Sequence, residues 1–462
     1  MSALAQWLRA DGWQVRGTDS VRSEVTDILE REGISVEVGS SAAIPPETIL
    51  LVYSDAVPAE HPLRRAASER GIRSVSYATL LGELTKSFAT VALAGSHGKS
   101  TPSALVGLLL DAAGKDPTVV VGTRVQAWQG RGVGNFRPGK SSIAVVEADE
   151  YRNHFLSLTP TVAVVTSVDH DHVDAFPTPA SYEAAFAEFV RLVRPGGTVV
   201  LAVSDQAAPA LRDAVTPGVS VLTFALGSEG EEVDVRASRS RVAEEEQVCS
   251  LRVRGEDWGT FSLRVPGAHM ASNVAAAVAA TVPFGMTPEI ARRVVSEFRG
   301  TWRRFEHVGT INGAPLISDY AHHPTELAAL LAAARQRYPG RRLLIAFQPH
   351  QRARTRAFAS EFIQALKAFD SVVLAEVYDV VGREEGEPIT TETWVELLRS
   401  SGRRATYAPT LAAVADAIRT QVEPDEVVLI VGAGDIDTVA RDLARTTGQE
   451  KGRTKKGLFA GV

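Results

Sequence analysis

The sequence predicts an α/β protein of three domains, with Rossmann-like first and last domains and a central α/β domain that carries an antiparallel appendage. Three observations support this prediction. Helical and strand-like segments alternate with short connections over most of the chain. A buried strand runs through a glycine turn into a helix at residues 91–101, and the last third holds a second series of buried strands. We place the domains at residues 1–86, 87–299 and 300–462.

Composition and charge narrow the class of protein. The 462 residues are enough for several domains with substantial cores. The formal net charge of −6 argues against a basic surface that would bind nucleic acid or an anionic membrane. The single cysteine, Cys249, excludes an intrachain disulfide, and no apolar run is long enough to cross a membrane. We therefore expect a cytoplasmic protein, with the lysine-rich end around Lys455 as a solvated tail.

The stretch at residues 91–101 is typical of a phosphate loop. A strand that turns through two glycines into a helix presents backbone N–H groups and a helix N-terminus to an anion. Lys99 would add a charge for the outer phosphates, and the Ser100 hydroxyl would ligate Mg²⁺. Leu93 stands where the general P-loop pattern has its first glycine, so a structural turn with an incidental lysine is the alternative. We predict that a nucleoside triphosphate binds here, in a P-loop ATPase-like domain. The contacting residues would be Gly95, Ser96, His97, Gly98, Lys99, Ser100 and Thr101.

Residues 1–86 alternate between helix and strand, which favours a parallel, Rossmann-like sheet. Asp19 follows the first predicted strand. In dinucleotide folds an acid at this place hydrogen-bonds a ribose hydroxyl, and the alternative is a turn or helix-capping aspartate. The predicted helices span residues 2–10, 24–32 and 62–70, and the predicted strands span residues 14–18, 49–53 and 73–76.

This first segment begins at a helix, whereas a Rossmann-like unit begins with a strand and a glycine-rich turn on which that helix leans. The absent strand would occupy the middle of the sheet and would leave both neighbours with unpaired backbone groups. We therefore expect the natural protein to start about 15–20 residues upstream of Met1, and its first domain to be N-terminally incomplete here. If Met1 is the genuine start, the first domain should be unstable or rearranged.

Acids and histidines follow two predicted strands of the central domain, at residues 143–147 and 162–166. Because parallel strands end at one edge of a sheet, these side chains should face the phosphate loop. Carboxylates with one imidazole suit Mg²⁺, and a two-histidine transition-metal site is the rival interpretation. For His170 alone we favour an ordinary loop histidine. The residues in question are Glu147, Asp149, Glu150, Asp169, His170, Asp171, His172 and Asp174.

The pattern changes to short alternating strands at residues 233–237, 247–253 and 260–265, which predicts the antiparallel appendage. An alanine-rich helix follows. His269 and Asn273 are four residues apart and would share one of its faces.

The last third predicts a second doubly wound unit, with buried strands at residues 343–347, 371–375 and 427–431. Pro324 is expected at the first position of a helix. Three arginines surround the glycine hinge at Gly300, and the planar fork of arginine suits phosphate oxygens. These arginines are Arg299, Arg303 and Arg304.

Together these stretches resemble the ATP-dependent Mur ligases of peptidoglycan synthesis over nearly the whole chain. The resemblance implies a UDP-sugar-binding first domain, an ATP-binding central domain and an amino-acid-binding last domain. Serines stand in the phosphate loop where threonine is usual in the family. The matching stretches are Gly95-Ser-His-Gly-Lys-Ser-Thr101, Glu147-Ala-Asp-Glu150, Asp171-His172, Arg303-Arg-Phe-Glu306, Asp319-Tyr-Ala-His-His-Pro324, Phe347-Gln-Pro-His350 and Gly432-Ala-Gly-Asp-Ile436.

The resemblance also implies a reaction. The lactyl carboxylate of UDP-N-acetylmuramate would attack the γ-phosphate of ATP, and L-alanine would displace phosphate from the acyl phosphate to form an amide. Mg²⁺ would be held by Ser100, Glu147 and His172, and the catalytic residues would be Lys99, Glu147, His172 and Arg304. The other implied contacts are His269 and Asn273 with adenine, Arg304 with the phosphates, Asp319 with the ribose, Asp19 and Ser54 with the UDP sugar, and Tyr320, His322 and Arg354 with the alanine carboxylate. The protein would act as a monomer or homodimer.

Two departures and two rivals accompany the resemblance. Met270 stands where the family commonly has asparagine, and the glycine-rich loop that holds the UDP sugar in relatives would lie before Met1. One rival is a murein peptide ligase that adds a recycled tripeptide, and the stretch Phe347-Gln-Pro-His350 speaks against it. The other is a non-catalytic nucleotide-binding protein, and the presence of Lys99, Glu147 and His172 speaks against that.

Overall fold

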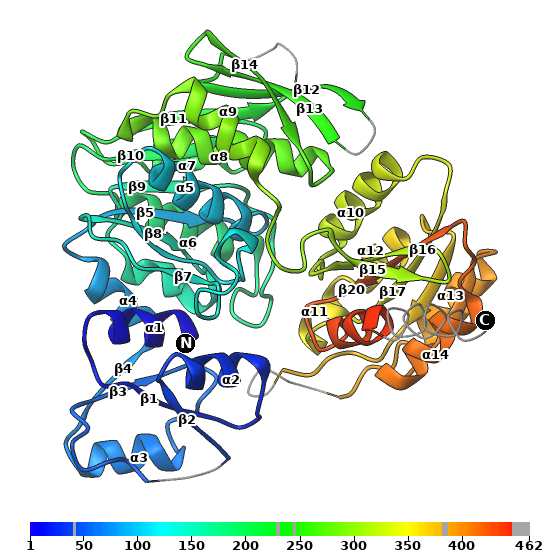
Figure 1. The fold of residues 1–462 in the computed structure, drawn as a ribbon, viewed down its shortest axis with the longest axis horizontal. Coiled ribbons are helices and arrows are strands. Elements are labelled where there is room, and N and C mark those ends of the chain that lie inside the picture. Colours follow the sequence, from blue (N-terminus) through cyan, green and yellow to red (C-terminus); the bar gives the residue numbers. More distant parts are fainter. Residues whose placement is uncertain (40–42, 228–231, 244–245, 381–386, 446–462) are drawn as a thin grey trace, which may run out of the picture. The chain divides into compact units, whose positions relative to one another are not determined.

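A computed structural model of the chain describes residues 1–39, 43–227, 232–243, 246–380 and 387–445. The lysine-rich end around Lys455 lies outside them. The chain divides into two compact units, residues 1–264 with 269–301 and residues 265–268 with 302–462 (Figure 1). Among the described residues, every helix is too short or too polar to span a membrane.

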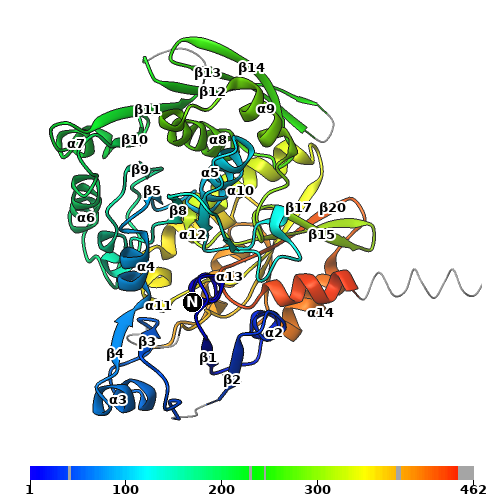
Figure 2. The same cartoon turned by 60° about the vertical axis from the view of Figure 1, so that its left-hand side comes forward.

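The first 85 residues form two separate pairs of parallel strands. β1 pairs with β2, and β3 pairs with β4, as the two arms in Figure 2 show. The parallel pairing agrees with the predicted Rossmann-like unit, and within the described residues β1 and β3 do not pair with each other, as expected for neighbours of an absent middle strand. The sequence also missed β2, of which only Val36 is buried, and α4, which begins directly after β4. The elements are α1 (Ser2–Ala10), β1 (Arg16–Asp19), α2 (Glu24–Arg31), β2 (Ser35–Val38), β3 (Leu50–Tyr53), α3 (Pro62–Glu69), β4 (Arg73–Ser76) and α4 (Tyr77–Thr85).

Helix α1 packs on the central part of the first unit. The Trp7 ring stacks on Phe136 at 6.2 Å and meets Phe88 edge-on at 5.8 Å. Gln6 accepts a hydrogen bond from the backbone N–H of Val133 at 3.0 Å and donates one to Asn135 Oδ1 at 3.0 Å. Aromatic burial and a satisfied amide therefore hold this helix in place.

The central sheet has ten strands in the order β14-β13-β12-β11-β10-β9-β5-β8-β6-β7. Its core strands β8, β5 and β9 are parallel neighbours, so their carboxyl ends meet at one edge, as predicted. The elements are β5 (Ala89–Ala94), α5 (Ser100–Ala112), β6 (Thr118–Val120), η1 (Gln126–Trp128), β7 (Phe136–Arg137), β8 (Ile143–Glu147), η2 (Tyr151–Ser157), β9 (Val162–Val165), α6 (Pro179–Arg191), β10 (Thr198–Ala202), α7 (Ala208–Asp213), β11 (Ser220–Leu226), β12 (Val235–Ala243), β13 (Glu246–Val253), β14 (Glu256–Leu263), α8 (Ala268–Thr281), η3 (Val282–Phe284) and α9 (Pro288–Glu297).

The predicted appendage is antiparallel within itself but continues the main sheet. β12, β13 and β14 pair antiparallel, while β12 also pairs parallel with β11. The alanine-rich helix α8 is confirmed. Its residues 275–280 are fully buried, because small side chains allow close helix packing.

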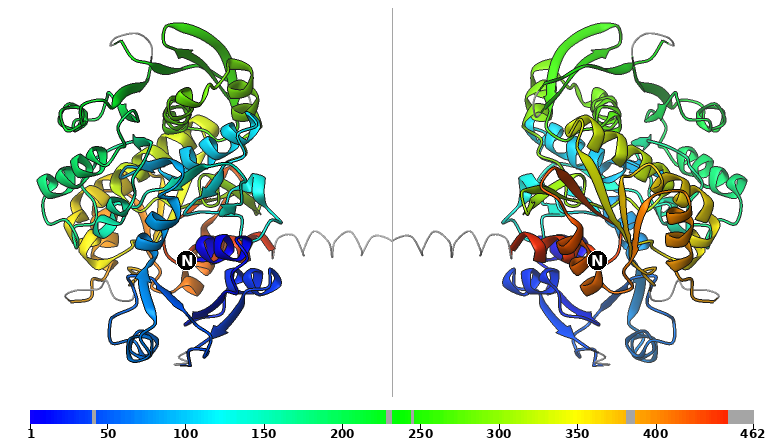
Figure 3. Two further views of the ribbon diagram at one scale, coloured as in Figure 1. Left: turned by 90° about the vertical axis from the view of Figure 1, so that its left-hand side faces the viewer. Right: turned by 90° about the vertical axis from the view of Figure 1, so that its right-hand side faces the viewer.

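The second unit holds a six-stranded sheet in the order β15-β16-β20-β17-β18-β19, parallel except for β15. Side chains alternate across β17, so Leu344 faces α14 and the helix over residues 437–445, while Phe347 meets Phe362 of α12 at 5.5 Å. The ribbon of this unit, coloured from yellow to red, is seen from two sides in Figure 3. Helices on both faces confirm the doubly wound unit. The elements are β15 (Glu306–Ile311), β16 (Ala314–Asp319), α10 (Pro324–Arg337), β17 (Arg342–Phe347), α11 (Arg352–Ala357), α12 (Ala359–Leu366), β18 (Ser371–Leu374), α13 (Glu392–Ser400), β19 (Arg404–Tyr407), α14 (Leu411–Gln421) and β20 (Glu426–Val431).

A mostly buried ion pair joins β15 to the helix over residues 437–445. Arg441 binds Glu306 through both carboxylate oxygens, at 2.8 and 2.6 Å, and Asp437 at 3.2 Å. Because the carboxylates of Glu306 and Asp437 are only 13% and 9% exposed, Arg441→Met should lower the free energy of unfolding by about 2–3 kcal/mol. Chemical denaturation measures this. The exposed pair of Arg445 with Asp442 supplies the control, since Arg445→Met should change little. Equal effects of the two variants would contradict the prediction.

Candidate active site

The phosphate loop joins β5 to α5, and two of its glycines have a backbone that other residues rarely adopt. Gly95 has φ +138° and Gly98 has φ +74°. A Cβ at Gly95 would lie 2.0 Å from Thr166 Oγ1, and one at Gly98 would lie 2.6 Å from Asn273 Oδ1. The segment after β9 and the helix α8 thus close around the loop and fix its path, and glycine is required at both positions.

Lys99 lies just before α5, and its ammonium turns back onto the loop. Nζ donates to the Gly95 carbonyl at 2.5 Å and lies 2.9 Å from Oε1 of Glu150, which is fully buried. Burial disfavours the lysine charge, but the charges of Glu150 and Asp149 outweigh that effect and raise the pKa of Lys99. A permanent positive charge therefore lies at the loop.

Ser100 opens α5 beside the acid at the end of β8. Its Oγ donates to Glu147 Oε1 at 2.8 Å, and the other carboxylate oxygen accepts from the backbone N–H of Gly122 at 2.6 Å. The structure therefore brings Ser100 and Glu147 together, as predicted for two oxygen ligands of one cation. Thr101 is buried in the same helical turn.

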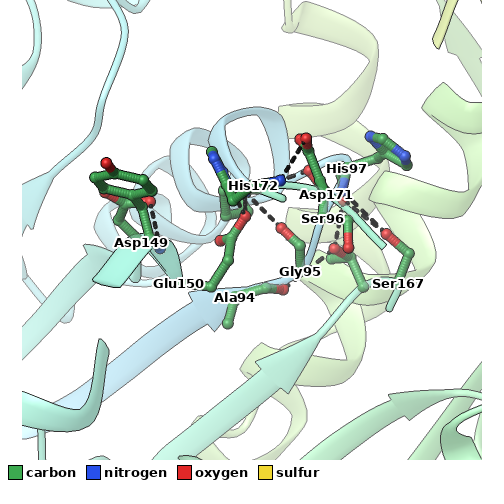
Figure 4. Close-up of polar contacts among 12 residues, drawn as sticks. Ala94, Gly95, Ser96, His97, Asp149, Glu150, Ser167, Asp171 and His172 are labelled. Atoms are coloured by element: carbon green, nitrogen blue, oxygen red, sulfur yellow. Dashed lines mark hydrogen bonds and ion pairs between the residues drawn. The ribbon is translucent and has the colours of Figure 1, made fainter. Parts of the chain in front are cut away.

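His172 groups with the two acids that follow Glu147 in the sequence. Ligand atoms of Asp149, Glu150 and His172 all lie within 4.8 Å of one another. Figure 4 shows Glu150 reaching toward His172 and the phosphate loop, and His172 Nε2 lies 3.4 Å from Glu150 Oε1. Oε2 of Glu150 and Nδ1 of His172 are buried without a hydrogen-bond partner. The unused lone pairs of Glu150 and His172, beside the carboxylate of Asp149, fit a divalent cation.

The predicted metal ligands thus fall into two adjacent groups. Glu147 lies with Ser100, and His172 lies with Glu150, which also holds Lys99. His170 does not join His172, because its Nε2 hydrogen-bonds the Phe176 carbonyl at 2.8 Å. That placement supports the ordinary loop histidine over the two-histidine interpretation.

A charged contact links this acidic segment to the first segment of the chain. His154 lies 3.2 Å from Asp149 Oδ2 and also contacts Asp55, which follows β3. Partial desolvation opposes ionisation of the half-exposed Asp149, but the hydrogen bond from His154 and the charge of Lys99 lower the pKa of Asp149 to about 2. Asp149 is therefore ionised at neutral pH.

Ser96 and His97 tie the loop to the segment after β9. Ser96 Oγ accepts from the backbone N–H of Asp169 at 2.8 Å. The backbone N–H of His97 donates to Ser167 Oγ at 3.0 Å, and its ring Nε2 lies 2.9 Å from Asp169 Oδ2. Both predicted nucleotide residues thus have structural partners within the first unit.

The two predicted adenine residues differ in their surroundings. Asn273 is 8% exposed and packs against the loop at Gly98. His269 is exposed, one turn earlier on α8. Met270 is buried, with its sulfur 4.0 Å from Asn273 Nδ2, so it contacts the neighbouring amide in place of a polar side chain.

The predicted UDP-sugar residues form local turns. Asp19 Oδ1 accepts from the backbone N–H of Val21 at 3.2 Å, and Ser54 Oγ accepts from that of Ala56 at 3.4 Å. For Asp19 this is the turn interpretation, and the ribose contact stays a prediction.

In the second unit, Asp319 braces the segment that carries Arg304. Its two oxygens accept from the backbone N–H groups of Phe305, at 2.7 Å, and Ala321, at 2.8 Å. Burial raises the pKa of Asp319, although the Arg304 charge and these N–H groups oppose that rise. The Arg304 guanidinium lies 5.2 Å from the Tyr320 ring centre and 3.8 Å from Glu326 Oε1.

The residues predicted to bind an amino acid form one cluster in this unit. The His322 ring lies 5.2 Å from the Tyr320 ring and 6.1 Å from the His350 ring. Nη1 of the buried Arg354 lies 3.4 Å from His350 Nδ1. The structure therefore brings Tyr320, His322 and Arg354 together through His350, to which the sequence analysis had assigned no binding role.

The sequence also gave no role to Tyr182 and no link between Glu150 and Lys99. Tyr182 Oη lies 3.0 Å from Ser96 Oγ and 3.3 Å from Glu150 Oε1. Nothing in the local pattern of α6 distinguishes this tyrosine from a core aromatic, so only the fold could identify it.

Comparison with known families assigns all three parts of the chain. Residues 1–89 match the family described as Mur ligase family, catalytic domain. Residues 93–281 match the Mur ligase middle domain, and residues 303–434 match the Mur ligase, glutamate ligase domain.

Curated relatives cover nearly the whole chain. A UDP-N-acetylmuramate–L-alanine ligase of Kineococcus radiotolerans is 38% identical, over 96% of this chain and 93% of its own length. The enzyme of that name from Salinibacter ruber is 37% identical, over 94% of this chain and 90% of its own length. The crystal structure of UDP-N-acetylmuramate-alanine ligase MurC from Thermotoga maritima matches with a TM-score of 0.81 and 26% identity, over 97% of each chain.

Proposed function

This chain belongs to the Mur ligase family, and on that premise we propose that it joins L-alanine to the lactyl carboxylate of UDP-N-acetylmuramate in a reaction driven by ATP. The observation that carries this proposal is the identity of 37–38% with enzymes of that name over more than nine-tenths of the chain. A reaction with ATP and two further substrates agrees with a phosphate loop in the first unit and a cluster of arginine and histidine in the second unit.

In this reaction the protein has to position the reactants and neutralise the charge that develops. The lactyl carboxylate attacks the γ-phosphorus of ATP, which gives an acyl phosphate and ADP. The amine of L-alanine then attacks the acyl carbon, phosphate leaves, and an amide forms. In both steps negative charge shifts onto phosphate oxygens, so the fixed ammonium of Lys99 stabilises the transition state. Backbone N–H groups at the start of α5 add to that stabilisation.

A divalent cation fits the residues beside the loop. Ser100 with Glu147, and His172 with Glu150, offer oxygen and imidazole donors, and the unpartnered atoms of Glu150 and His172 support such a site. Bound there, Mg²⁺ would neutralise part of the triphosphate charge. We assign Ser100, Glu147 and His172 as its ligands.

The remaining roles follow the family pattern. Asn273 and His269 contact adenine, Asp319 the ribose, and Arg304 the phosphates. Tyr320, His322 and Arg354 hold the carboxylate of L-alanine. The positive guanidinium of Arg354 pairs with the negative carboxylate. Asp19 and Ser54 contact the UDP sugar. We place the reaction in the cytoplasm and expect a monomer or homodimer.

Phosphate release tests the proposal. Wild-type protein with ATP and Mg²⁺ should release phosphate only when UDP-N-acetylmuramate and L-alanine are both present. A parallel reaction in which the recycled tripeptide replaces L-alanine separates the murein peptide ligase alternative. Release with the tripeptide alone would favour that alternative, and no release under any condition would favour a non-catalytic nucleotide-binding protein. A chelator should stop the reaction, and added Mg²⁺ should restore it.

Two substitutions at Ser100 test the metal assignment. Ser100→Ala removes the hydroxyl that donates to Glu147, so the Mg²⁺ concentration for half-maximal rate should rise about tenfold, the equivalent of one lost ligand contact. Ser100→Thr keeps a hydroxyl and should stay within about threefold of wild type, by the same reasoning. A Mg²⁺ titration that is identical for Ser100→Ala and wild type would contradict the assignment.

A further inference from the structure

Tyr182 is a fully buried phenol beside the phosphate loop. It lies in the first turns of α6, a helix that Thr178 caps by accepting from the Ser181 backbone N–H. Its ring packs edge-on against Phe176 and Phe186, each at 5.1 Å. Because these aromatic neighbours enclose the ring, the hydroxyl has one fixed position.

The hydroxyl lies between two residues of the site. It is 3.0 Å from Ser96 Oγ and 3.3 Å from Glu150 Oε1. The phenol donates its proton to Glu150 Oε1, which leaves the phenol oxygen to accept from Ser96 Oγ. Burial and the nearby charge of Glu150 raise the pKa of Tyr182, which keeps this proton in place at neutral pH.

The same carboxylate oxygen is the contact for Lys99. Oε1 of Glu150 lies 2.9 Å from Lys99 Nζ, 3.3 Å from the Tyr182 hydroxyl and 3.4 Å from His172 Nε2. Glu150 is fully buried, so these side chains and not water must compensate its charge. Without the Tyr182 hydroxyl, the Lys99 ammonium must compensate more of the Glu150 charge. The ammonium is then held more tightly by Glu150 and is less free to move to a phosphate.

We propose that Tyr182 is a positioning residue for nucleotide binding and phosphoryl transfer. It holds and partly neutralises Glu150, so that the carboxylate orients Lys99 without competing with the triphosphate. This inference rests on the proposed function in one respect, that Lys99 meets the phosphates of ATP.

A double-mutant cycle tests whether Tyr182 acts through Glu150. The four proteins are wild type, Tyr182→Phe, Glu150→Gln and the double variant, and calorimetry gives the Kd for ATP with Mg²⁺. Tyr182→Phe should weaken binding about tenfold, the scale of a hydrogen bond to a charged group. In the Glu150→Gln background, Tyr182→Phe should change the Kd for ATP by less than about twofold, because glutamine carries no charge for the phenol to compensate.

Tyr407→Phe is the matched control. It also removes a phenol that hydrogen-bonds a glutamate, Glu376, but in the second unit. Its Kd for ATP should match that of wild type. Thermal melting is measured for every protein, and Tyr182→Phe should lower Tm by only a few degrees, about 2–4 °C, since phenylalanine fills the same aromatic packing.

Three outcomes would overturn the inference. The first is a Kd of Tyr182→Phe for ATP within twofold of wild type. The second is a loss of ATP affinity on Tyr182→Phe that is as large in the Glu150→Gln background as in wild type. The third is a loss of ATP affinity together with a Tm drop beyond about 6 °C, which one lost hydrogen bond does not explain. Failure of the proposed function is distinguishable, because wild type would then bind ATP without releasing phosphate in the presence of both other substrates. Reduced kcat of Tyr182→Phe with an unchanged KM for L-alanine should accompany the binding result.

Discussion

Lys99→Ala should lower the rate of phosphate release by at least a hundredfold. The ammonium is held over the loop by the Gly95 carbonyl and Glu150, and alanine leaves no positive charge to meet the negative charge that develops on the phosphate oxygens. Loss of one preorganised electrostatic contact of this kind typically costs about 10²–10³ in kcat. Steady-state phosphate release with saturating substrates measures the effect.

Lys115→Ala is the control for this variant. Lys115 is exposed beyond the far end of α5, so its substitution removes one lysine charge without touching the loop. Its rate should match wild type. A Lys99→Ala protein that folds and keeps more than about a tenth of the wild-type rate would contradict the role given to Lys99.

Gly95→Ala should abolish ATP binding while most of the protein stays folded. The new Cβ would lie 2.0 Å from Thr166 Oγ1 and 3.0 Å from the backbone N–H nitrogen of Ser167, so the segment after β9 or the loop itself must move. Either movement displaces the N–H groups that should surround the triphosphate, and misplacement by about 1 Å can cost about a hundredfold in rate. Calorimetry with ATP and Mg²⁺ measures the loss.

Gly114→Ala separates this collision from the strain of a left-handed backbone. Gly114 also has a positive φ, +71°, but an added Cβ there would meet nothing within 4 Å. The control variant should lose about 1 kcal/mol of stability and no ATP affinity. If the two alanine variants bound ATP equally well, the packing of the loop against the segment after β9 would not matter for the nucleotide.

The strand-turn-helix at the loop could be predicted because its signals are local. Small apolar residues form a buried strand, glycines allow the turn, and the helix must begin at once. The convergence of Glu147 and the segment around His172 was also predictable, because parallel strands end at one sheet edge. These rules need only the order of elements and the residues at strand ends.

Other features depend on contacts between distant parts of the chain. Tyr182 contacts Ser96 and Glu150 only because α6 packs against the loop. In the sequence, a tyrosine at the helical spacing of apolar residues is predicted to be an ordinary core residue. The division of the predicted metal ligands into two groups depends on side-chain directions within one turn of chain, which sequence spacing does not give. Strand β2 was missed because only Val36 of its four residues is buried, which leaves too little hydrophobic pattern to predict a strand.

The central claim is that Lys99, Glu147 and His172 serve one metal-bound triphosphate. A crystal structure with Mn²⁺ and a non-hydrolysable ATP analogue tests it most directly, because anomalous scattering locates the metal. We predict Lys99 Nζ within hydrogen-bonding distance of a phosphate oxygen, and metal positions about 2.0–2.4 Å from ligand atoms of Ser100, Glu147 and His172. A triphosphate bound elsewhere, or a metal more than roughly 10 Å from Glu147 or His172 where ligand bonds are about 2 Å, would contradict the account.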